Sequence, residues 1–444
     1  MKQAEPLDLP RFSADRYVAE LRGADLIRSN GRVCQVIGVV IESLGPQMAV
    51  GETCRISYRR NAGPVLAEVV GFRDNKVLIM PLGELAGIGA GSEVFALGRP
   101  LEVAVSDALL GRVLDGLGRV MDGGAPIEGA ERRAIIAAPP NPLDRPRIDR
   151  SLSVGIRAVD GLLTCGKGQR VGVFAGSGVG KSTVLGMVAR NTNADVNVIA
   201  LVGERGKEVR DFIERDLGPE GLARSVVIVA TSDQPALVRI KAAFVATTIA
   251  EYFRDRGLDV TLMMDSVTRF AMAQREVGLA IGEPTTTKGY TPSVFALLPR
   301  LLERAGTSPR GTITGIYAVL VDGDDLNEPV ADAVRSILDG HIVLSRSLAA
   351  ANHYPAIDVL NSISRVMPDV TDEVHQRAAG AVRDLLATYR EAEDLINIGA
   401  YVPGSNAKVD LAIAKIESIR HFLRQDTYEG STLEQAVAGV VAIS

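Results

Sequence analysis

A glycine-rich loop that ends in a lysine and a hydroxyl residue is the strongest chemical signal in the sequence. The run AGSGVGKST occupies residues 175–183, after the apolar run RVGVF and before the helix-like run VLGMVAR. A strand, a glycine loop and a helix N-terminus together direct backbone N–H groups at phosphate oxygens. We expect Lys181 to reach the β- and γ-phosphates and Ser182 to ligate Mg²⁺. Ala175 stands where this motif usually has its first glycine.

An apolar run that ends in a carboxylate supplies a second candidate anchor for Mg²⁺. Residues 260–265 read VTLMMD, which is the form of a buried strand followed by an acid. Two interpretations of Asp265 compete. The carboxylate either holds the metal or caps the helix that begins near Val267. The phosphate loop some eighty residues earlier favours the metal.

A carboxylate and a guanidinium follow another predicted strand. The run 197–202 ends in Gly203-Glu204-Arg205. Ligands of open α/β folds bind at the carboxyl edge of the sheet, so Glu204 could polarise a water molecule there and Arg205 could neutralise phosphate charge. On spacing alone, a solvent-facing loop pair is the favoured interpretation of the two residues, because charged loop ends are common.

The elements that must position these residues fall into three kinds. Short alternating runs between residues 31 and 98, separated by Gly, Pro and Asn-Lys turns, predict a small antiparallel β-barrel. A proline-rich stretch at 135–150 predicts an extended connector whose arginines face solvent. Beyond it, apolar strands alternate with helical patterns, which predicts a mainly parallel sheet covered by helices on both faces.

The residue pattern in the last part of the chain predicts helices only. Apolar residues recur at helical spacing after about Pro368, and Ser431 followed by Glu434 has the form of a capping box. The expected fold is therefore α/β, with a barrel, a central P-loop core and a C-terminal helical domain. The expected boundaries are 1–24 for an N-terminal segment, 25–98 for the barrel, 99–368 for the core and 369–444 for the helices.

Composition excludes several classes of protein. The 444 residues carry 49 basic and 54 acidic side chains, a formal net charge of −5, which argues against a protein that coats nucleic acid. Three scattered cysteines and four unclustered histidines predict neither a disulfide framework nor a zinc site. The first residues lack the pattern of a secretory signal and no run is long enough to span a bilayer, so we expect a cytoplasmic protein.

Six ordered motifs together resemble the type III protein-export ATPases, which are relatives of the catalytic subunits of rotary ATP synthases. The motifs are AGSGVGKST, GERGKEVRDF, MMDSVTRFAMAQREVGLAIGEP, GYTPSVFALLPRLLERAG, LDGHIVLSR and HYPAIDVLNSISRVMP. GRVLDGLGRVMDGG, beginning at Gly111, also fits. The resemblance therefore extends from the barrel into the C-terminal helices. It is strongest to the flagellar export ATPases. It implies a RecA-like fold for the central core.

The resemblance implies an ATP- and Mg²⁺-dependent site built from named residues. Glu204 would be the catalytic carboxylate, Arg205 a phosphate contact and Glu208 a Mg²⁺ contact through water. Asp265 would be the Walker B acid, with Arg269 in the same D-S-x-T-R motif. The implied nucleotide-binding residues are Gly176, Ser177, Gly178, Val179, Gly180, Lys181, Ser182, Thr183 beside the α-phosphate, and Tyr354 on adenine. Without the resemblance, Tyr354 reads as a half-buried tyrosine.

The resemblance also implies a ring. Arg365 in SISR would be an arginine finger that reaches the γ-phosphate in the neighbouring subunit of a homohexamer, so a monomer should be nearly inactive. Implied partners are a stator or regulator near the N-terminal segment, a central stalk, an export gate and chaperone–substrate complexes, at the inner membrane. Residues 285–287 read Thr-Thr-Thr where the flagellar pattern reads Pro-Ala-Thr, which leaves pore contacts open.

Four alternatives compete with a flagellar export motor. An injectisome export ATPase shares every motif. A catalytic ATP synthase subunit is disfavoured because its finger would come from a different subunit. A transcription-termination helicase is disfavoured by the acidic charge balance and by the lack of aromatic residues for RNA in the barrel. A non-hydrolysing structural subunit would lack the carboxylate that this chain has at Glu204.

Overall fold

The computed structural model describes residues 30–57, 63–321, 323 and 325–444. The expectations for the N-terminal segment 1–24, including its contact with a regulator, lie outside the described residues. None of the helices in the described ranges is long and apolar enough to cross a membrane.

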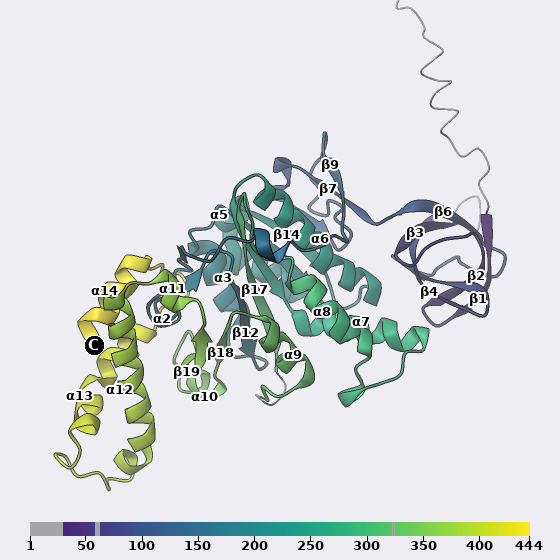
Figure 1. Ribbon diagram of the computed structural model, residues 1–444. Helices are drawn as coiled ribbons and strands as arrows, with labels where there is room; N and C mark the ends of the chain where they lie inside the picture. Colours follow the sequence, from purple (N-terminus) through teal and green to yellow (C-terminus); the bar gives the residue numbers. More distant parts are fainter. Residues whose placement is uncertain (1–29, 58–62, 322, 324) are drawn as a thin grey trace, which may run out of the picture.

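Six antiparallel strands close into the predicted barrel at one end of the molecule (Figure 1). Cys54 and Ile56 point into its small apolar core and Arg55 between them is exposed, as the alternating pattern predicts. The strands pair in the order β1-β2-β5-β4-β3-β6. Their bounds are β1 Asn30–Ile37, β2 Val40–Leu44, β3 Glu52–Ser57, β4 Val65–Arg73, β5 Lys76–Pro81 and β6 Glu93–Pro100.

A nine-stranded sheet forms the central domain. Its strands are nearly continuous apolar runs because helices cover both faces. The order is β19-β18-β12-β17-β15-β13-β14-β8, parallel except for β19, with β16 antiparallel beside β17. The bounds are β8 Val113–Asp115, β12 Arg170–Ala175, β13 Val196–Val202, β14 Ser225–Ala230, β15 Asp259–Asp265, β16 Gly306–Thr307, β17 Thr312–Leu320, β18 Gly340–Leu344 and β19 Ile357–Ser364.

Two separate apolar clusters occupy the two faces of this sheet, since alternate strand residues point to opposite sides. One face packs against α6 Ala236–Asp255, α7 Val267–Ile281, α8 Pro292–Leu302 and α9 Pro329–Ile337. The other packs against α2 Arg157–Leu162, α3 Lys181–Asn191, the π-helical turn η3 Phe212–Leu217 and α5 Gly218–Ala223, with α4 Gly206–Asp211 before η3.

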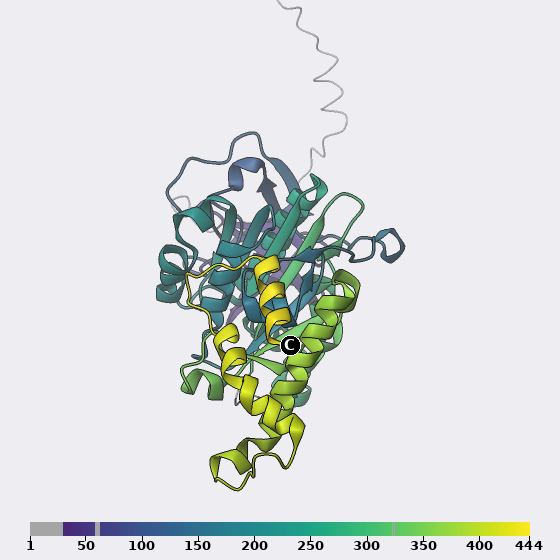
Figure 2. The ribbon, with the colours of Figure 1, turned by 90° about the vertical axis from the view of Figure 1, so that its left-hand side faces the viewer.

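The C-terminal part is helical, as predicted, and lies at the end of the molecule opposite the barrel (Figures 1 and 2). A long pair, α12 Glu373–Asn397 and α13 Ala407–Leu423, packs side by side, and α14 Leu433–Ile443 lies on α2. The short helices α10 Arg346–Ala350 and α11 Met367–Val370 flank β19.

The predicted capping box at Ser431 and Glu434 is wrong by one residue. The Thr432 hydroxyl accepts from the Gln435 N–H and the Gln435 side chain accepts from the Thr432 N–H. Both pairs satisfy the S/T-x-x-E/Q spacing, so the spacing alone could not choose between them. The helix that starts at Leu433 buries Ala436 and Val440.

The connector at 135–150 is extended apart from one 3-10 turn, η2 Pro142–Asp144, but Arg145 is not a solvated side chain. Its guanidinium donates to the carbonyl oxygens of Glu303 and Ala305, at 2.5 and 3.0 Å. The arginine therefore fastens the connector to the core. The remaining small elements are β7 Glu102–Val105 paired with β9 Glu131–Ala134, β10 Ser151–Leu152 paired with β11 Cys165–Gly166, η1 Asp107–Leu109 and η4 Thr287–Gly289.

Candidate active site

The glycine loop lies between the end of β12 and the start of α3. Gly178 and Gly180 have φ of +80° and +96°, a left-handed conformation that side chains with a Cβ rarely adopt. Among the described residues no side chain caps α3, so the first N–H groups of the helix are available to an anion. A Cβ on Gly178 would meet nothing within 4 Å, which leaves open space over the loop.

Three charged side chains meet at the carboxyl edge of the sheet. The Lys181 ammonium contacts the Asp265 carboxylate and lies 3.5 Å from Glu204 Oε1. All three side chains are largely buried, at 10%, 4% and 13% exposure for Lys181, Asp265 and Glu204. β12, β13 and β15 run parallel, so their carboxyl ends share one edge and bring these residues together.

The environment of these charges shifts their pKa values. Burial, reinforced by the nearby Asp265 charge and opposed by Lys181, raises the pKa of Glu204 to about 7. Burial disfavours the charged ammonium, but Asp265 and Glu204 outweigh it and raise the pKa of Lys181. Lys181 therefore stays charged, and Glu204 exchanges a proton near neutral pH, as suits a group that accepts a proton from water.

The competing interpretation of Asp265 as a helix cap is wrong. Ser266 is the N-cap of α7, and its hydroxyl accepts from the Arg269 N–H at 3.3 Å. The Asp265 carboxylate is directed at Lys181 instead. Gly203 allows the Arg269 side chain to pack close, because a Cβ on Gly203 would lie 2.8 Å from it.

Arg205 points away from this cluster, whereas Glu208 reaches its edge. Arg205 is 82% exposed and forms an ion pair with Glu208 at 3.5 Å, near the start of α4. Glu208 also hydrogen-bonds Glu204, which contributes to the raised pKa of Glu204. In the single chain, Glu208 therefore adjoins the site and the guanidinium of Arg205 lies in solvent.

Tyr354 lies beside the phosphate loop. Its side chain is 44% exposed, and a Cβ on Gly180 would lie 3.8 Å from its ring. The ring lines an open cavity of about 1290 Å³ together with Arg157, Phe422 and Gln425. This cavity is wide enough for a nucleoside next to the phosphate loop.

The residues at this edge fit Mg²⁺ bound together with a triphosphate. The Ser182 hydroxyl is exposed at the start of α3, and Asp265 provides a carboxylate on the adjacent edge. Within the described ranges no group of three or more His, Cys, Asp or Glu side chains could hold a metal. Mg²⁺ commonly needs only one or two protein oxygens when phosphates and water complete its shell.

Arg365 lies at the opposite edge of the sheet. β19 runs antiparallel to β18, so Arg365, which follows its last residue, lies near the start of β12. Its N–H donates to the Asp339 carbonyl at 3.0 Å, and Asp339 binds Arg170, the first residue of β12. The length of β12, roughly 15–20 Å, separates it from the phosphate loop of its own chain.

Comparison with known proteins agrees with the sequence resemblance. Three family models match: the β-barrel domain of the ATP synthase alpha/beta family at 33–98, its nucleotide-binding domain at 155–364, and the T3SS EscN ATPase C-terminal domain at 371–441. The flagellum-specific ATP synthase of Bacillus subtilis (strain 168) is 56% identical, over 95% of this chain and 96% of that protein. The chain belongs to the type III export ATPases of the ATP synthase alpha/beta family.

Relatives of this ATPase come from both kinds of export system. The type 3 secretion system ATPase of Xanthomonas euvesicatoria is 53% identical, over 94% of each chain. The solved structure of the assembled ATPase EscN from enteropathogenic E. coli has a TM-score of 0.88 at 47% identity, covering 93% of this chain and 99% of that chain. The fold of the export ATPase is thus the one that the motifs predicted.

Sequence reasoning missed the C-terminal contribution to the site. Gln425 donates its N–H to the Tyr354 carbonyl at 3.0 Å, while its side chain bonds the Gly155 carbonyl and the Arg157 N–H. The Arg157 side chain in turn binds the Phe422 carbonyl. The contacts of Gly155 and Arg157 join residues 265 to 270 positions apart in sequence, and no local pattern signals them.

Proposed function

We propose that this ATPase is the Mg-ATP-hydrolysing subunit of a homohexameric motor in the flagellar type III export apparatus. The observation that carries the proposal is the separation of Arg365 from Lys181, Glu204 and Asp265 on opposite edges of one sheet. A chain arranged in this way completes a site only against a second copy. The assembled relative EscN supports such an arrangement.

Each site residue has a proposed role. Lys181 and the loop 176–180 bind the β- and γ-phosphates, and Thr183 lies beside the α-phosphate. Mg²⁺, held by Ser182 and Asp265 with Glu208 through water, would neutralise phosphate charge. Glu204 orients the attacking water and accepts its proton, since its pKa lies near 7.

Three further residues complete the proposed site. Tyr354 stacks on adenine from beside Gly180. Arg365 of the neighbouring copy stabilises the charge of the transition state, together with Arg205 after it turns inward.

The partners belong to the same proposal. A solved structure of EscN with its central stalk EscO, 46% identical with a TM-score of 0.86, supports a stalk in the ring opening. We further propose a stator or regulator, an export gate and chaperone–substrate complexes as partners, and a location in the cytoplasm at the inner membrane. ATP hydrolysis would release chaperones and unfold export substrates.

The test is a chromosomal Glu204→Gln substitution in the source organism, with Glu214→Gln as the matched control. Glu214 is 61% exposed on η3 and forms a surface ion pair with Arg210, so replacing its carboxylate with an amide should have little effect. Loss of swimming together with filament protein missing from the medium is expected for Glu204→Gln. Normal swimming would contradict the flagellar assignment.

An injectisome motor is the second candidate, and the similarity to the Xanthomonas enzyme and to EscN favours it. The same strains decide between the two. Normal swimming with a different set of secreted proteins lost would move this ATPase to the injectisome branch. Normal motility and normal secretion would contradict both.

A further inference from the structure

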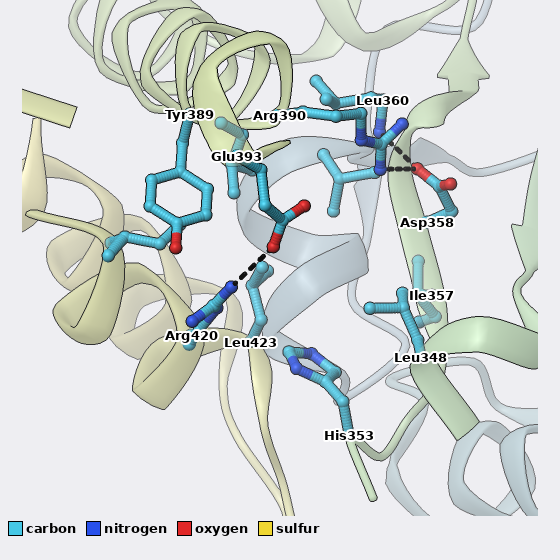
Figure 3. A pocket seen from close by; sticks show the side chains of 13 residues that line it. Leu348, His353, Ile357, Asp358, Leu360, Tyr389, Arg390, Glu393, Arg420 and Leu423 are labelled. Carbon is cyan, nitrogen blue, oxygen red and sulfur yellow. Dashed lines mark hydrogen bonds and ion pairs between the residues drawn. The ribbon is translucent and has the colours of Figure 1, made fainter. Parts of the chain in front are cut away.

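A cavity of about 140 Å³ lies at the junction between the nucleotide-binding core and the C-terminal helices (Figure 3). Its walls come from α10 and β19 on one side and from α12 and α13 on the other. We call it the junction cavity. Apolar side chains provide most of the wall, among them Leu348, Ile357, Leu386 and Ile416.

The charged groups around the junction cavity neutralise one another in pairs. Arg390 pairs with Asp358 at 3.0 Å, and Arg420 pairs with Glu393 at 3.5 Å. Arg420 also lies over the ring of Tyr389, 5.1 Å from its centroid. Figure 3 shows both ion pairs on the rim of the cavity. A ligand with a net charge would therefore find no unmatched opposite charge here.

One polar atom in this wall has no partner. His353 is 5% exposed, and its Nε2 is buried without a hydrogen bond in the described structure. Its ring is directed toward the cavity in Figure 3. Burial, with Arg424 and Arg420 nearby, lowers the pKa of His353, so the imidazole is neutral at pH 7. A buried ring nitrogen without a protein partner is unusual, and a polar atom of a bound molecule in the cavity would satisfy it.

Size and chemistry together define the ligand class. An apolar cavity of about 150 Å³ in another protein holds one benzene molecule, so a single ring fits here. A neutral imidazole presents either a donor or an acceptor at Nε2, and a hydroxyl group can satisfy both. We propose that the junction cavity binds a neutral, single-ring hydroxylated molecule through His353, and that the bound ligand tightens ATP binding by holding the adjacent Tyr354.

The link to ATP follows the backbone. His353 precedes Tyr354 directly, and its N–H donates to the carbonyl of Leu348, a wall residue of the cavity, at 2.9 Å. On the other wall, Leu423 lies two residues before Gln425, which holds the Tyr354 carbonyl. A ligand between these walls restrains both supports of the tyrosine. This second half of the proposal rests on the proposed contact of Tyr354 with adenine.

The binding test uses the full chain without nucleotide, with phenol as the probe and benzene as the probe that lacks the hydroxyl. Saturation-transfer NMR should give a dissociation constant for phenol of about 1–10 mM, as expected for so small a ligand. His353→Leu should weaken phenol about five- to tenfold and leave benzene unchanged. Ile416→Phe and Leu348→Phe fill the cavity from its two walls and should abolish binding of both probes.

Outcomes separate the two halves of the proposal. Absence of phenol binding to the native chain, or equal binding by native and filled variants that unfold at the native temperature, overturns the site. The coupling half predicts that phenol and ATP lower each other's dissociation constants by the same factor, twofold or more. Phenol binding without that shift overturns the coupling. If Tyr354→Ala leaves ATP affinity unchanged, the proposed adenine contact fails even where phenol binds.

Discussion

The two edges of the central sheet hold similar charges in different ways. At the carboxyl edge, one ammonium, Lys181, faces two carboxylates, Glu204 and Asp265, and all three are buried. At the amino edge, Arg170 forms a bidentate pair with Asp339 at 3.1 Å and a second ion pair with the more exposed Glu303 at 2.5 Å. Arg365 beside them is exposed. The first edge thus carries an excess of buried negative charge, and the second presents a cation outward.

The difference between the two edges shows how the parts of one proposed active site are distributed over two copies of the chain. Buried, unbalanced carboxylates cost free energy unless a cation joins them, so the residues of the carboxyl edge fit the Mg²⁺ and the phosphate on Lys181 that we propose. The amino-edge ion pairs of Arg170 with Asp339 and Glu303 join β12 to neighbouring segments of the core and serve the fold. Arg365 is not a member of these ion pairs, and its exposed side chain can contact another molecule.

The largest expected effect comes from Arg365→Ala. The ATPase rate should fall about 10³-fold or more while thermal unfolding stays unchanged, because in the proposed ring the exposed guanidinium acts on a neighbour's phosphate. Steady-state hydrolysis by assembled protein measures this. Normal activity would mean that the amino edge has no part in catalysis.

Rings that contain two different inactive variants test the shared site more directly. Rings assembled from equal amounts of Arg365→Ala and Glu204→Gln chains should regain about a quarter of the native rate, since one interface in four then has both residues intact. A mixture as inactive as its two components would contradict a site shared between copies.

Glu204→Gln should lower kcat about 10²–10⁴-fold with ATP binding retained, because only the proton acceptor is lost. Isothermal titration with ATP and a hydrolysis assay separate the two effects. Glu214→Gln serves as the control and should match the native enzyme. Loss of ATP binding in Glu204→Gln would show that the carboxyl edge needs this charge to hold nucleotide.

Asp339→Ala tests the amino edge as a structural region. Removing one of the two carboxylates that pair with Arg170 should reduce the free energy of unfolding by about 1–3 kcal/mol, and the rate should change less than about threefold. Denaturant unfolding and hydrolysis, measured on the same preparation, decide this. A large rate loss at native stability would erase the distinction between the two edges.

The smallest effect on stability is expected for Arg205→Ala. Its exposed ion pair with Glu208 should contribute less than about 1 kcal/mol to stability. We expect a rate loss of about tenfold, from the phosphate contact that the side chain makes after it turns inward. An unchanged rate would leave Arg205 where the single chain places it, in solvent.

Local sequence determined the parts of this protein that depend on adjacent residues. The loop 175–183 predicts its strand, turn and helix because glycine freedom and a helix N-terminus act over a few residues. The meeting of Lys181, Glu204 and Asp265 also followed from sequence, since parallel strands share their carboxyl edge. The roles expected of Tyr354 and Arg365 came from the family resemblance, because the spacing of residues alone predicted neither role.

Tertiary structure decided what depends on distant contacts. The antiparallel direction of β19 carries Arg365 away from its own phosphate loop, and nothing in the run SISR encodes that direction. Arg145, expected in solvent, binds carbonyls more than 150 residues away. The contacts of Gln425 and the junction cavity likewise form only when α12 and α13 pack against the core. Residue patterns and secondary-structure propensities act between residues that are close in sequence. The burial, pairing and orientation of side chains instead depend on contacts between segments that are far apart in sequence.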